Sequence, residues 1–183
     1  MEAALAGAVL AELVLQRRIA LSDQRVVIID ETPTQHPVLD KTLFDILNAA
    51  RPRKLRYWIN TLTYQRLLDE IVHHLIERNV LMRKKKRLRL VSSHLESPAG
   101  DISAQYSLKN RLRETVLAGQ APQQAERVLL AFLMRTGLLK LIFTPGERKT
   151  AHKRIKKLIE YGEEESALGD TLNEILNASV SSP

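Results

Sequence analysis

The chain has 183 residues with a net charge of +7, from 28 Lys and Arg against 21 Asp and Glu, and it contains no cysteine. This length allows one domain with its own core. The lack of cysteine excludes disulfides and thiolate sites, and it fits a reducing cytosolic compartment. Apolar residues reach 44% but aromatic residues only 4%. We therefore expect a single, mostly α-helical domain over 1–183 with two small β-hairpins and a basic surface suited to anionic partners.

The first 30 residues predict a buried helix followed by a hairpin. Residues 2–16 are rich in Ala and Leu, and a helix that is apolar all round belongs inside a domain. Residues 19–21 and 26–29 are short β-prone runs on either side of Ser22-Asp23-Gln24. This pattern is typical of two strands joined by a polar turn.

A loop and a helix are expected next. Pro33 and Pro37 disfavour helix in residues 31–37, because each also pushes the preceding residue toward extended geometry. Asp40 then looks like the N-cap of a helix in KTLFDILNAA. Its apolar stripe is expected to comprise Leu43, Ile46 and Leu47.

Two more helices are expected after Pro52, which ends the preceding one. The helix from about Arg53 places four apolar residues on one face at helical spacing: Leu55, Trp58, Ile59 and Leu62. Residues 64–78 predict one strongly amphipathic helix, with apolar residues at i, i+1, i+4 and i+5. Asn79 can end it in a left-handed conformation.

The most unusual stretch, NVLMRKKKRLRLV, runs from Asn79 to Val91. Six of the seven residues in 83–89 are Lys or Arg, and apolar residues then alternate with basic ones. The alternation predicts a second hairpin, or wing, with a cationic tip. Residues 92–103 (SSHLESPAGDIS) are expected to form a loop because of their Ser, Pro and Gly content.

The last third of the chain predicts further helices. Ser107 is expected to cap a helix that Gly119 closes, and Pro122 to open another over 123–133 that Gly137 punctuates. Thr144-Pro145-Gly146 reads as a turn.

The chain is expected to end in two helices and a frayed tail. A basic amphipathic helix covers 148–162, and a final helix covers 166–178. Residues 179–183 should fray, as chain ends commonly do.

Two apolar stretches, 3–15 and 128–143, were compared with the requirements of a membrane span. The first is short and contains Glu12, and the second is interrupted by Arg135 and Lys140. Both fall short of the roughly 20 apolar residues that a span needs. Membrane contact, if there is any, should be peripheral.

The sequence shows no sign of an enzyme, a metal site or a cofactor site. It has no G-x-S-x-G, no Gly-rich phosphate loop and no H-E-x-x-H. The one histidine pair, His73-His74, consists of helix neighbours that point about 100° apart. We expect one of these imidazoles to be half-buried and the other exposed. The acidic pairs Asp69-Glu70 and 163–165 have no recognisable catalytic partner.

Three basic runs remain, and they leave three readings open. Residues 51–56 hold four cations, 83–89 hold six and 148–157 hold six. They could meet an anionic membrane leaflet, where each cation contributes on the order of 1 kcal/mol. An amphipathic helix followed by a basic hairpin also resembles a DNA-binding winged helix. The third reading is a solvated surface with no ligand.

Several pieces of the chain, in order, resemble the Golgi phosphoprotein 3 family, including its bacterial members. The matching pieces are ALAGAVLAELVLQRRIAL (4–21), RVVIIDETPTQHPVLDKTLFDIL (25–47), ARPRKLRYWINTL (50–62), LIERNVL (75–81), LKNRLRETVLAG (108–119) and VLLAFLMRTGLLKLIF (128–143) with the basic helix after it. Together they span nearly the whole chain.

The resemblance implies a helical, non-enzymatic adaptor for protein sorting on the cytosolic face of membranes, at the Golgi if the source is eukaryotic. Its eukaryotic members bind phosphatidylinositol 4-phosphate in a basic pocket and contact the cytosolic tails of membrane enzymes. Homo-oligomers are a further expectation. The pocket arginines of the family fall at Ala6, Gln65 and Leu68 here, with Arg66 nearby, and the pocket tryptophan falls before Ala4, in a part of the family domain that this chain is expected to lack.

We therefore expect the lipid-binding site to lie on the second hairpin. The family's apolar hairpin tip is replaced by RKKKRLR, which would attract anionic lipids through diffuse charge. The predicted anionic-lipid-binding residues are Arg83, Lys84, Lys85, Lys86, Arg87 and Arg89, with Arg66 added from the resemblance. A winged-helix module that binds nucleic acid through the same hairpin is the alternative.

Overall fold

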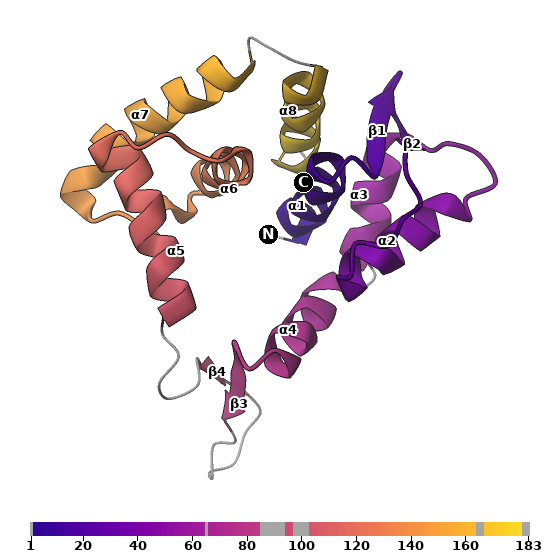
Figure 1. Cartoon of the computed structure of the whole chain (residues 1–183), viewed down its shortest axis with the longest axis horizontal. Coiled ribbons are helices and arrows are strands. Elements are labelled where there is room, and N and C mark those ends of the chain that lie inside the picture. Colours follow the sequence, from indigo (N-terminus) through magenta and orange to yellow (C-terminus); the bar gives the residue numbers. More distant parts are fainter. Residues whose placement is uncertain (1, 65, 85–93, 97–102, 164–166, 181–183) are drawn as a thin grey trace.

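The structure, a computed structural model, describes residues 2–64, 66–84, 94–96, 103–163 and 167–180. In these ranges the chain is mostly α-helical with two antiparallel hairpins, as predicted (Figure 1). The helices are α1 (Glu2–Leu15), α2 (Pro37–Leu47), α3 (Leu55–Tyr64), α4 (Leu67–Glu77), α5 (Ser103–Arg113), α6 (Gln124–Arg135), α7 (Pro145–Glu163) and α8 (Ala167–Val180). The strands are β1 (Ile19–Ser22), β2 (Arg25–Ile28), β3 (Met82–Lys84) and β4 (His94–Glu96).

Helix α1 lies in the middle of the molecule, where it packs against α8, α3 and α6 (Figure 1). Leu10 and Leu13 are fully buried, as expected of a helix that is apolar all round. The contact with α8 is close at Gly7, because a Cβ there would lie 1.9 Å from Ser179 Oγ. Ser179 was expected in a frayed tail. It belongs instead to α8, where it is buried and donates a hydrogen bond to the Ile175 carbonyl at 2.6 Å.

The hairpin β1–β2 forms where it was predicted, with Ile19 opposite Ile28 and Ser22 opposite Arg25. Its turn residues, Asp23 and Gln24, have φ of 49° and 62°, the conformation of the tight turns that suit the strand twist. The hairpin is fixed to the start of α3, because the Val26 amide donates to the Arg53 carbonyl and the Leu55 amide to the Gln24 carbonyl, both at 2.9 Å.

The start of α2 differs from the prediction. The helix begins at Pro37, since proline is well suited to the first helical position, where no amide is needed. Asp40 is therefore not the N-cap. Its carboxylate accepts hydrogen bonds from the amide and hydroxyl of Thr34, at 2.6 and 2.7 Å, and so holds the preceding loop. Of the predicted stripe, Leu43 and Ile46 are buried, but Leu47 is 44% exposed.

The amphipathic helix predicted over 64–78 forms, but it begins at Leu67 and not at Tyr64. Helix α3 ends at Tyr64 and α4 begins at Leu67, with Arg66 left-handed at φ 55° between them. The four inward residues predicted for α3 are all buried: Leu55, Trp58, Ile59 and Leu62. In α4 only Leu67 is buried among the described residues of the helix, because few elements cover it. Asn79 ends α4 with φ 57°, as predicted.

A second buried cluster joins α5, α6 and α7, with Leu112, Leu130 and Ile155 at its centre. Between α5 and α6 lies a π-helical segment, Glu114–Ala118, which Gly119 ends at φ 80°, as predicted. A short 3₁₀ segment, Leu138–Leu141, follows α6 after Gly137 (φ 71°).

Three local predictions in the second half of the chain are wrong. Helix α5 already begins at Ser103, so Ser107 lies within the helix and does not cap it. Pro145 opens α7 and is not part of a turn, for the same reason as Pro37 in α2. Residues 92–103 are not all loop, because 94–96 form strand β4.

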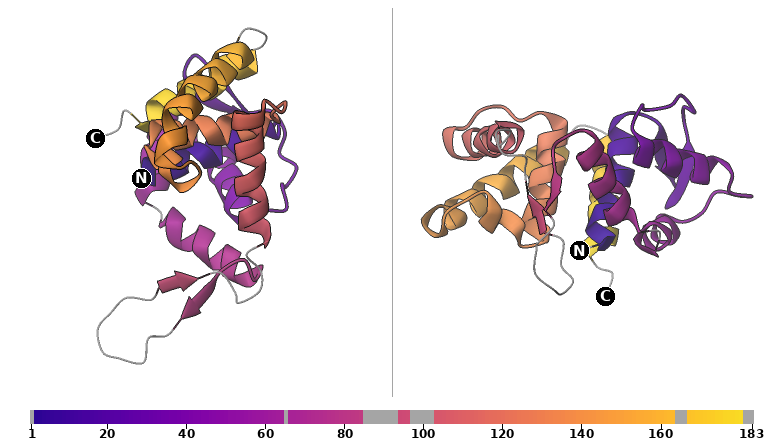
Figure 2. Two further views of the ribbon diagram at one scale, coloured as in Figure 1. Left: turned by 90° about the vertical axis from the view of Figure 1, so that its left-hand side faces the viewer. Right: turned by 90° about the horizontal axis from the view of Figure 1, so that it is seen from below.

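Hairpin β3–β4 lies at one end of the molecule, beyond α4 and away from α1 and α8 (Figures 1 and 2). The opposite end is occupied by α7 and by the end of α8 nearest to it (Figure 1). No helix in the described part of the chain is both long and apolar enough to cross a bilayer.

Candidate functional site

The predicted cationic hairpin forms as an antiparallel pair. Met82 lies opposite Glu96, Arg83 opposite Leu95 and Lys84 opposite His94. The first two predicted site residues, Arg83 and Lys84, thus belong to β3. The remaining four lie outside the described residues, in the connection from β3 to β4: Lys85, Lys86, Arg87 and Arg89.

Arg66 lies between α3 and α4, at the opposite end of α4 from strand β3. Its backbone is left-handed, and its exposed side chain borders a cleft between the start of α1 and the α3–α4 junction. The cleft has a volume of about 290 Å³ and is lined by Glu2, Leu5, Thr63, Arg66, Leu67, Leu68 and Asp69. The cleft lies where α3 ends and α4 begins, and the left-handed backbone of Arg66 separates the two helices there.

Of the three positions at which the resemblance places the family's pocket arginines, one lines this cleft. Leu68 lies in its wall and is 49% exposed, Ala6 is buried and is not among the lining residues, and Gln65 lies outside the described residues. Among the described residues that line the cleft, Arg66 is the one cation, and Glu2 and Asp69 contribute two carboxylates. A phosphate-rich headgroup needs several converging cations. The described residues that line this cleft provide one cation and not several.

A second groove runs between α2 and α4 on the other side of Arg66. Lys41 on α2 pairs with Glu70 on α4 at 2.7 Å, and His73 with Glu77 at 3.2 Å. Its lining includes the cations Lys41 and Arg66 and three carboxylates (Asp69, Glu70 and Glu77), so the groove carries little net charge.

The histidine pair behaves as predicted. The His73 side chain is 71% exposed and that of His74 is 16% exposed. The His74 ring contacts that of His36 edge to face, with centroids 4.4 Å apart. Burial, and then the nearby His74 and Arg78, lower the pKa of His36. No cluster of ligands that could hold a metal ion occurs among the described residues.

The basic run 51–56 forms a separate exposed patch beside the β1–β2 turn. The Arg53 guanidinium lies 5.2 Å from the centre of the Tyr57 ring, and Arg25 donates to the Pro52 carbonyl at 3.0 Å. Sequence reasoning overlooked Tyr57, although its i, i+4 spacing from Arg53 was a usable signal. This patch and the hairpin β3–β4 come from different parts of the fold (Figure 1).

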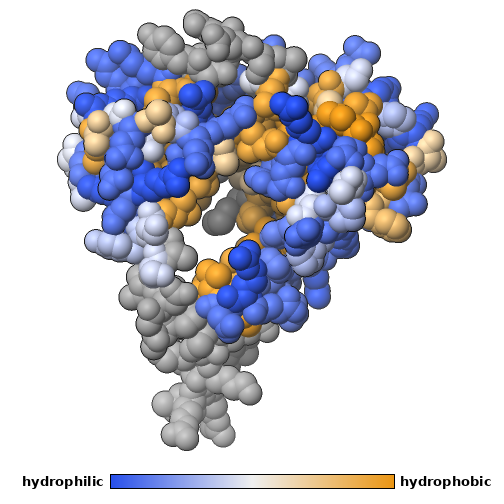
Figure 3. All heavy atoms as spheres, in the orientation of Figure 1, coloured by the Kyte–Doolittle hydropathy of each residue, from blue (hydrophilic) through white to orange (hydrophobic). Residues whose placement is uncertain are grey.

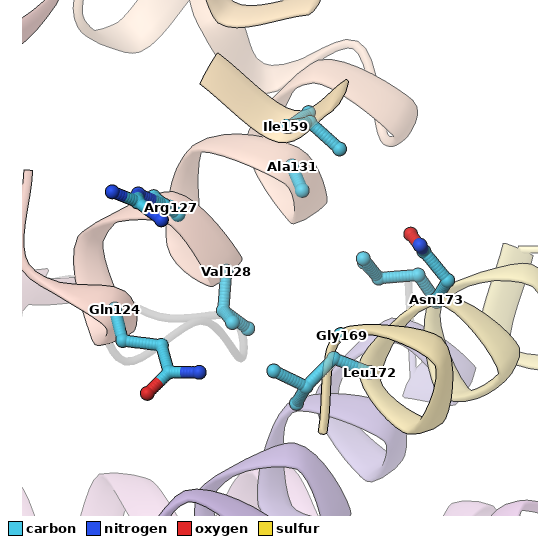
Figure 4. A pocket seen from close by; sticks show the side chains of 9 residues that line it. Gln124, Arg127, Val128, Ala131, Ile159, Gly169, Leu172 and Asn173 are labelled. Carbon is cyan, nitrogen blue, oxygen red and sulfur yellow. The ribbon is translucent and has the colours of Figure 1, made fainter. Parts of the chain in front are cut away.

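A small cleft separates α6 from α8 (Figure 4). Val128, Ala131 and Leu172 form apolar walls, and Gln124 and Asn173 lie at the edges. Its volume of about 50 Å³ suits one or two water molecules, at about 30 Å³ each. A lipid headgroup does not fit.

The chain was compared with models of known protein families. The model described as Golgi phosphoprotein 3 (GPP34) matches residues 1–179. The match includes the hairpin β3–β4, the α3–α4 junction and all the helices named above except the last residue of α8.

Proposed function

The chain belongs to the Golgi phosphoprotein 3 family, and on that premise we propose that it is a non-enzymatic peripheral membrane protein whose β3–β4 end binds anionic lipid headgroups. The observation that carries this proposal is the density of positive charge in the sequence that starts within β3: six of the seven residues 83–89 are cations, of which Arg83 and Lys84 belong to the strand. Each cation close to an anionic leaflet contributes on the order of 1 kcal/mol, so six can hold the protein there reversibly.

The position of the hairpin supports a membrane contact. Strands β3 and β4 lie at one end of the molecule, so a flat surface can reach them without displacing the helical core (Figure 2). By family likeness, phosphatidylinositol 4-phosphate is the ligand and the cytosolic face of a membrane is the location. The protein would act there as a sorting adaptor for the cytosolic tails of membrane enzymes.

The cleft at Arg66 bears on headgroup selectivity. Since Glu2 and Asp69 accompany Arg66 there, a highly phosphorylated headgroup gains less in this cleft than in a pocket of several guanidinium groups. The charge of residues 83–89 therefore contributes most of the binding free energy. Because this charge attracts any anionic lipid, binding to phosphatidylserine should be nearly as strong as binding to the phosphoinositide.

DNA binding through a winged helix is less favoured. In such a module the helix before the wing enters the major groove, and here that helix is α4. Its partly or fully exposed carboxylates include Asp69, Glu70 and Glu77, which a phosphate backbone repels.

The test is co-sedimentation with three kinds of vesicle at about 150 mM salt, where exposed charges are screened beyond about 8 Å. The vesicles contain phosphatidylcholine alone, phosphatidylcholine with phosphatidylserine, or phosphatidylcholine with phosphatidylinositol 4-phosphate. We expect pelleting with both anionic vesicles and none with the neutral ones. Replacing Lys84, Lys85 and Lys86 by Glu should abolish it while the helical circular dichroism signal stays unchanged.

The matched control reverses the charge of three residues in the basic run 51–56, as Arg51→Glu, Lys54→Glu and Arg56→Glu. This variant changes the net charge by the same amount and should still pellet. Undiminished pelleting of the hairpin variant contradicts the site. Pelleting only with the phosphoinositide would mean that a selective pocket exists, and binding to duplex DNA in place of vesicles would favour the winged-helix alternative.

A further inference from the structure

Helix α7 carries a cationic face that the fold does not use. Ala151 and Ile155 are fully buried against the α5–α6 side, whereas Lys149, Lys153 and Lys157 are exposed. These three lysines follow each other at intervals of four residues, so they lie along one side of the helix. We call them the α7 lysine face.

The stretch of α7 that carries this face has no acidic residue of its own. The sequence from Arg148 to Ile159 contains no Asp or Glu. Among the described residues, no ion pair involves Lys149, Lys153 or Lys157. The surface over α7 is mainly hydrophilic (Figure 3).

Other contacts, not these lysines, attach α7 to the rest of the molecule. Arg113 forms a two-point ion pair with Glu147 at the start of α7, with N–O distances of 2.6 and 2.8 Å. Arg154 donates to the carbonyls of Val116 and Leu117 in the π-helical segment. The lysine face can therefore be neutralised or bound without loss of packing.

The location of the face excludes it from the membrane contact proposed above. Helix α7 and hairpin β3–β4 lie at opposite ends of the molecule in both Figure 1 and the left view of Figure 2. Helix α5 runs between these ends, and its 11 residues correspond to about 16 Å of helix. That exceeds the screening length of about 8 Å at physiological ionic strength. A bilayer at the hairpin end thus exerts little attraction on α7.

We propose that the α7 lysine face binds an acidic polypeptide segment of a partner protein while the opposite end of the molecule lies on the membrane. The orientation of the molecule on the membrane rests on the proposed function, whereas the binding of an acidic segment by the α7 lysine face does not. Consecutive lysines are separated by about 6 Å along the helix axis. Carboxylates four residues apart on a partner helix, or two apart on an extended segment, have nearly the same spacing.

The chemistry of the face favours a polypeptide over other anions. The apolar positions of α7, Ala151 and Ile155, are fully buried, so the helix has no apolar side to insert into a second bilayer. Residues 148–159 include no Phe, Tyr or Trp, and His152 is their one aromatic side chain. The face therefore lacks the row of aromatic rings on which successive nucleic-acid bases stack.

The first arm of the test is done in solution with fluorescein-labelled poly-L-glutamate, followed by fluorescence anisotropy. The full-length chain carries Lys84→Glu, Lys85→Glu and Lys86→Glu, so that the hairpin does not bind the probe. Adding Lys149→Gln, Lys153→Gln and Lys157→Gln should raise the Kd about tenfold, as expected for the loss of three exposed ion pairs. Three Lys→Arg changes at these positions should preserve binding.

The matched control for this arm removes three exposed cations elsewhere, as Arg51→Gln, Lys54→Gln and Arg56→Gln. It should raise the Kd less than twofold. An equal loss in both triple variants would overturn the inference, because net charge alone would then explain binding. Tighter binding of duplex DNA than of poly-L-glutamate at the lysine face would also overturn it.

The second arm uses phosphatidylserine vesicles and the chain with its native hairpin. Vesicles coated with the protein should recruit labelled poly-L-glutamate, and the Lys→Gln variant of α7 should pellet equally but recruit about tenfold less. Weaker pelleting of that variant would make α7 a membrane contact and refute the proposal. If the native chain does not pellet at all, the proposed function fails, while the solution arm still decides on the α7 lysine face.

Discussion

At the scale of single residues, direct contacts hold the pKa of the Glu147 carboxylate well below its ordinary value. It accepts two hydrogen bonds from Arg113 and one from the Thr144 amide at 2.9 Å. These bonds, with Arg113 the larger cause, lower the pKa of Glu147 to about 2. The interaction connects the end of α5 to the first turn of α7, two elements that are 34 residues apart in the sequence.

This contact predicts a pH dependence of stability. Because the folded-state pKa of Glu147, about 2, lies below the ordinary value of 4.5, folding is favoured by the ionised form. The contribution is fully present above that ordinary value and is lost as the pH falls toward the folded-state pKa. The unfolding temperature of the native chain should therefore fall more steeply in that interval than that of Glu147→Gln.

The control for this experiment is Asp23→Asn, which removes a carboxylate in the exposed β1–β2 turn, where asparagine also accepts the left-handed backbone. Its acid profile should follow that of the native chain. Parallel profiles for the native chain and Glu147→Gln would show that the Arg113 contact does not stabilise the fold in solution.

At the scale of elements, the break between α3 and α4 is the feature on which the candidate site depends. Periodicity predicted two helices here, one from about Arg53 and one over 64–78. Both form, but the boundary between them lies at Arg66, whose φ is 55°, so that α4 begins at Leu67. The interruption lets Leu67 reach the core while α4 extends toward the hairpin.

Substitutions at Arg66 should separate its backbone role from its charge. Arg66→Gly removes the steric cost of the left-handed conformation but raises the entropy of the unfolded chain, so the free energy of unfolding should change by less than about 1 kcal/mol. Arg66→Val should lower it by about 1–2 kcal/mol or more, because a β-branched residue resists positive φ. Urea unfolding measures both.

The same two variants test the charge of Arg66 in lipid binding. Both lack the guanidinium, so both should bind anionic vesicles equally and slightly less than the native chain. Equal stability of the Gly and Val variants would argue against a left-handed residue at this position. Unchanged vesicle binding would remove Arg66 from the predicted site.

At the scale of the whole molecule, two buried clusters adjoin each other. One surrounds α1 and includes Leu10 and Trp58; the other joins α5, α6 and α7 and includes Ile155. Ile159, half-buried on α7, packs against both. A single domain over 1–183 stays a prediction, and this shared contact is the physical reason to expect cooperative unfolding.

Cooperativity can be measured with the single tryptophan of the chain. Ile155→Ala should lower the free energy of unfolding by about 2–5 kcal/mol, the usual cost of a cavity in a core. If the clusters unfold together, this change shifts the Trp58 fluorescence transition as much as the circular dichroism transition, although Trp58 lies in the other cluster. Leu10→Ala, in the cluster of Trp58, is the matched control. If Ile155→Ala leaves the Trp58 fluorescence transition unchanged, the two clusters unfold as independent units.

Local chemistry alone determined much of this protein. The apolar pattern of α1, the polar turn at Asp23-Gln24, and the left-handed positions of Asn79, Gly119 and Gly137 all follow from residue type and short-range spacing. The same holds for the charge of residues 83–89 and for the mostly helical fold. These features depend on a few neighbouring residues, so the sequence is sufficient to predict them.

The tertiary structure decided which parts meet. Neither the turn at Arg66 nor the burial of Ser179 against Gly7 can be inferred from nearby residues, because each depends on the packing of elements far apart in the chain. The predicted lipid site was only partly located, since Lys85 to Arg89 lie outside the described residues. Periodicity shows that a helix such as α7 has a basic side. Only the packing of its other side against α5 and α6 decides that Lys149, Lys153 and Lys157 are exposed to solvent.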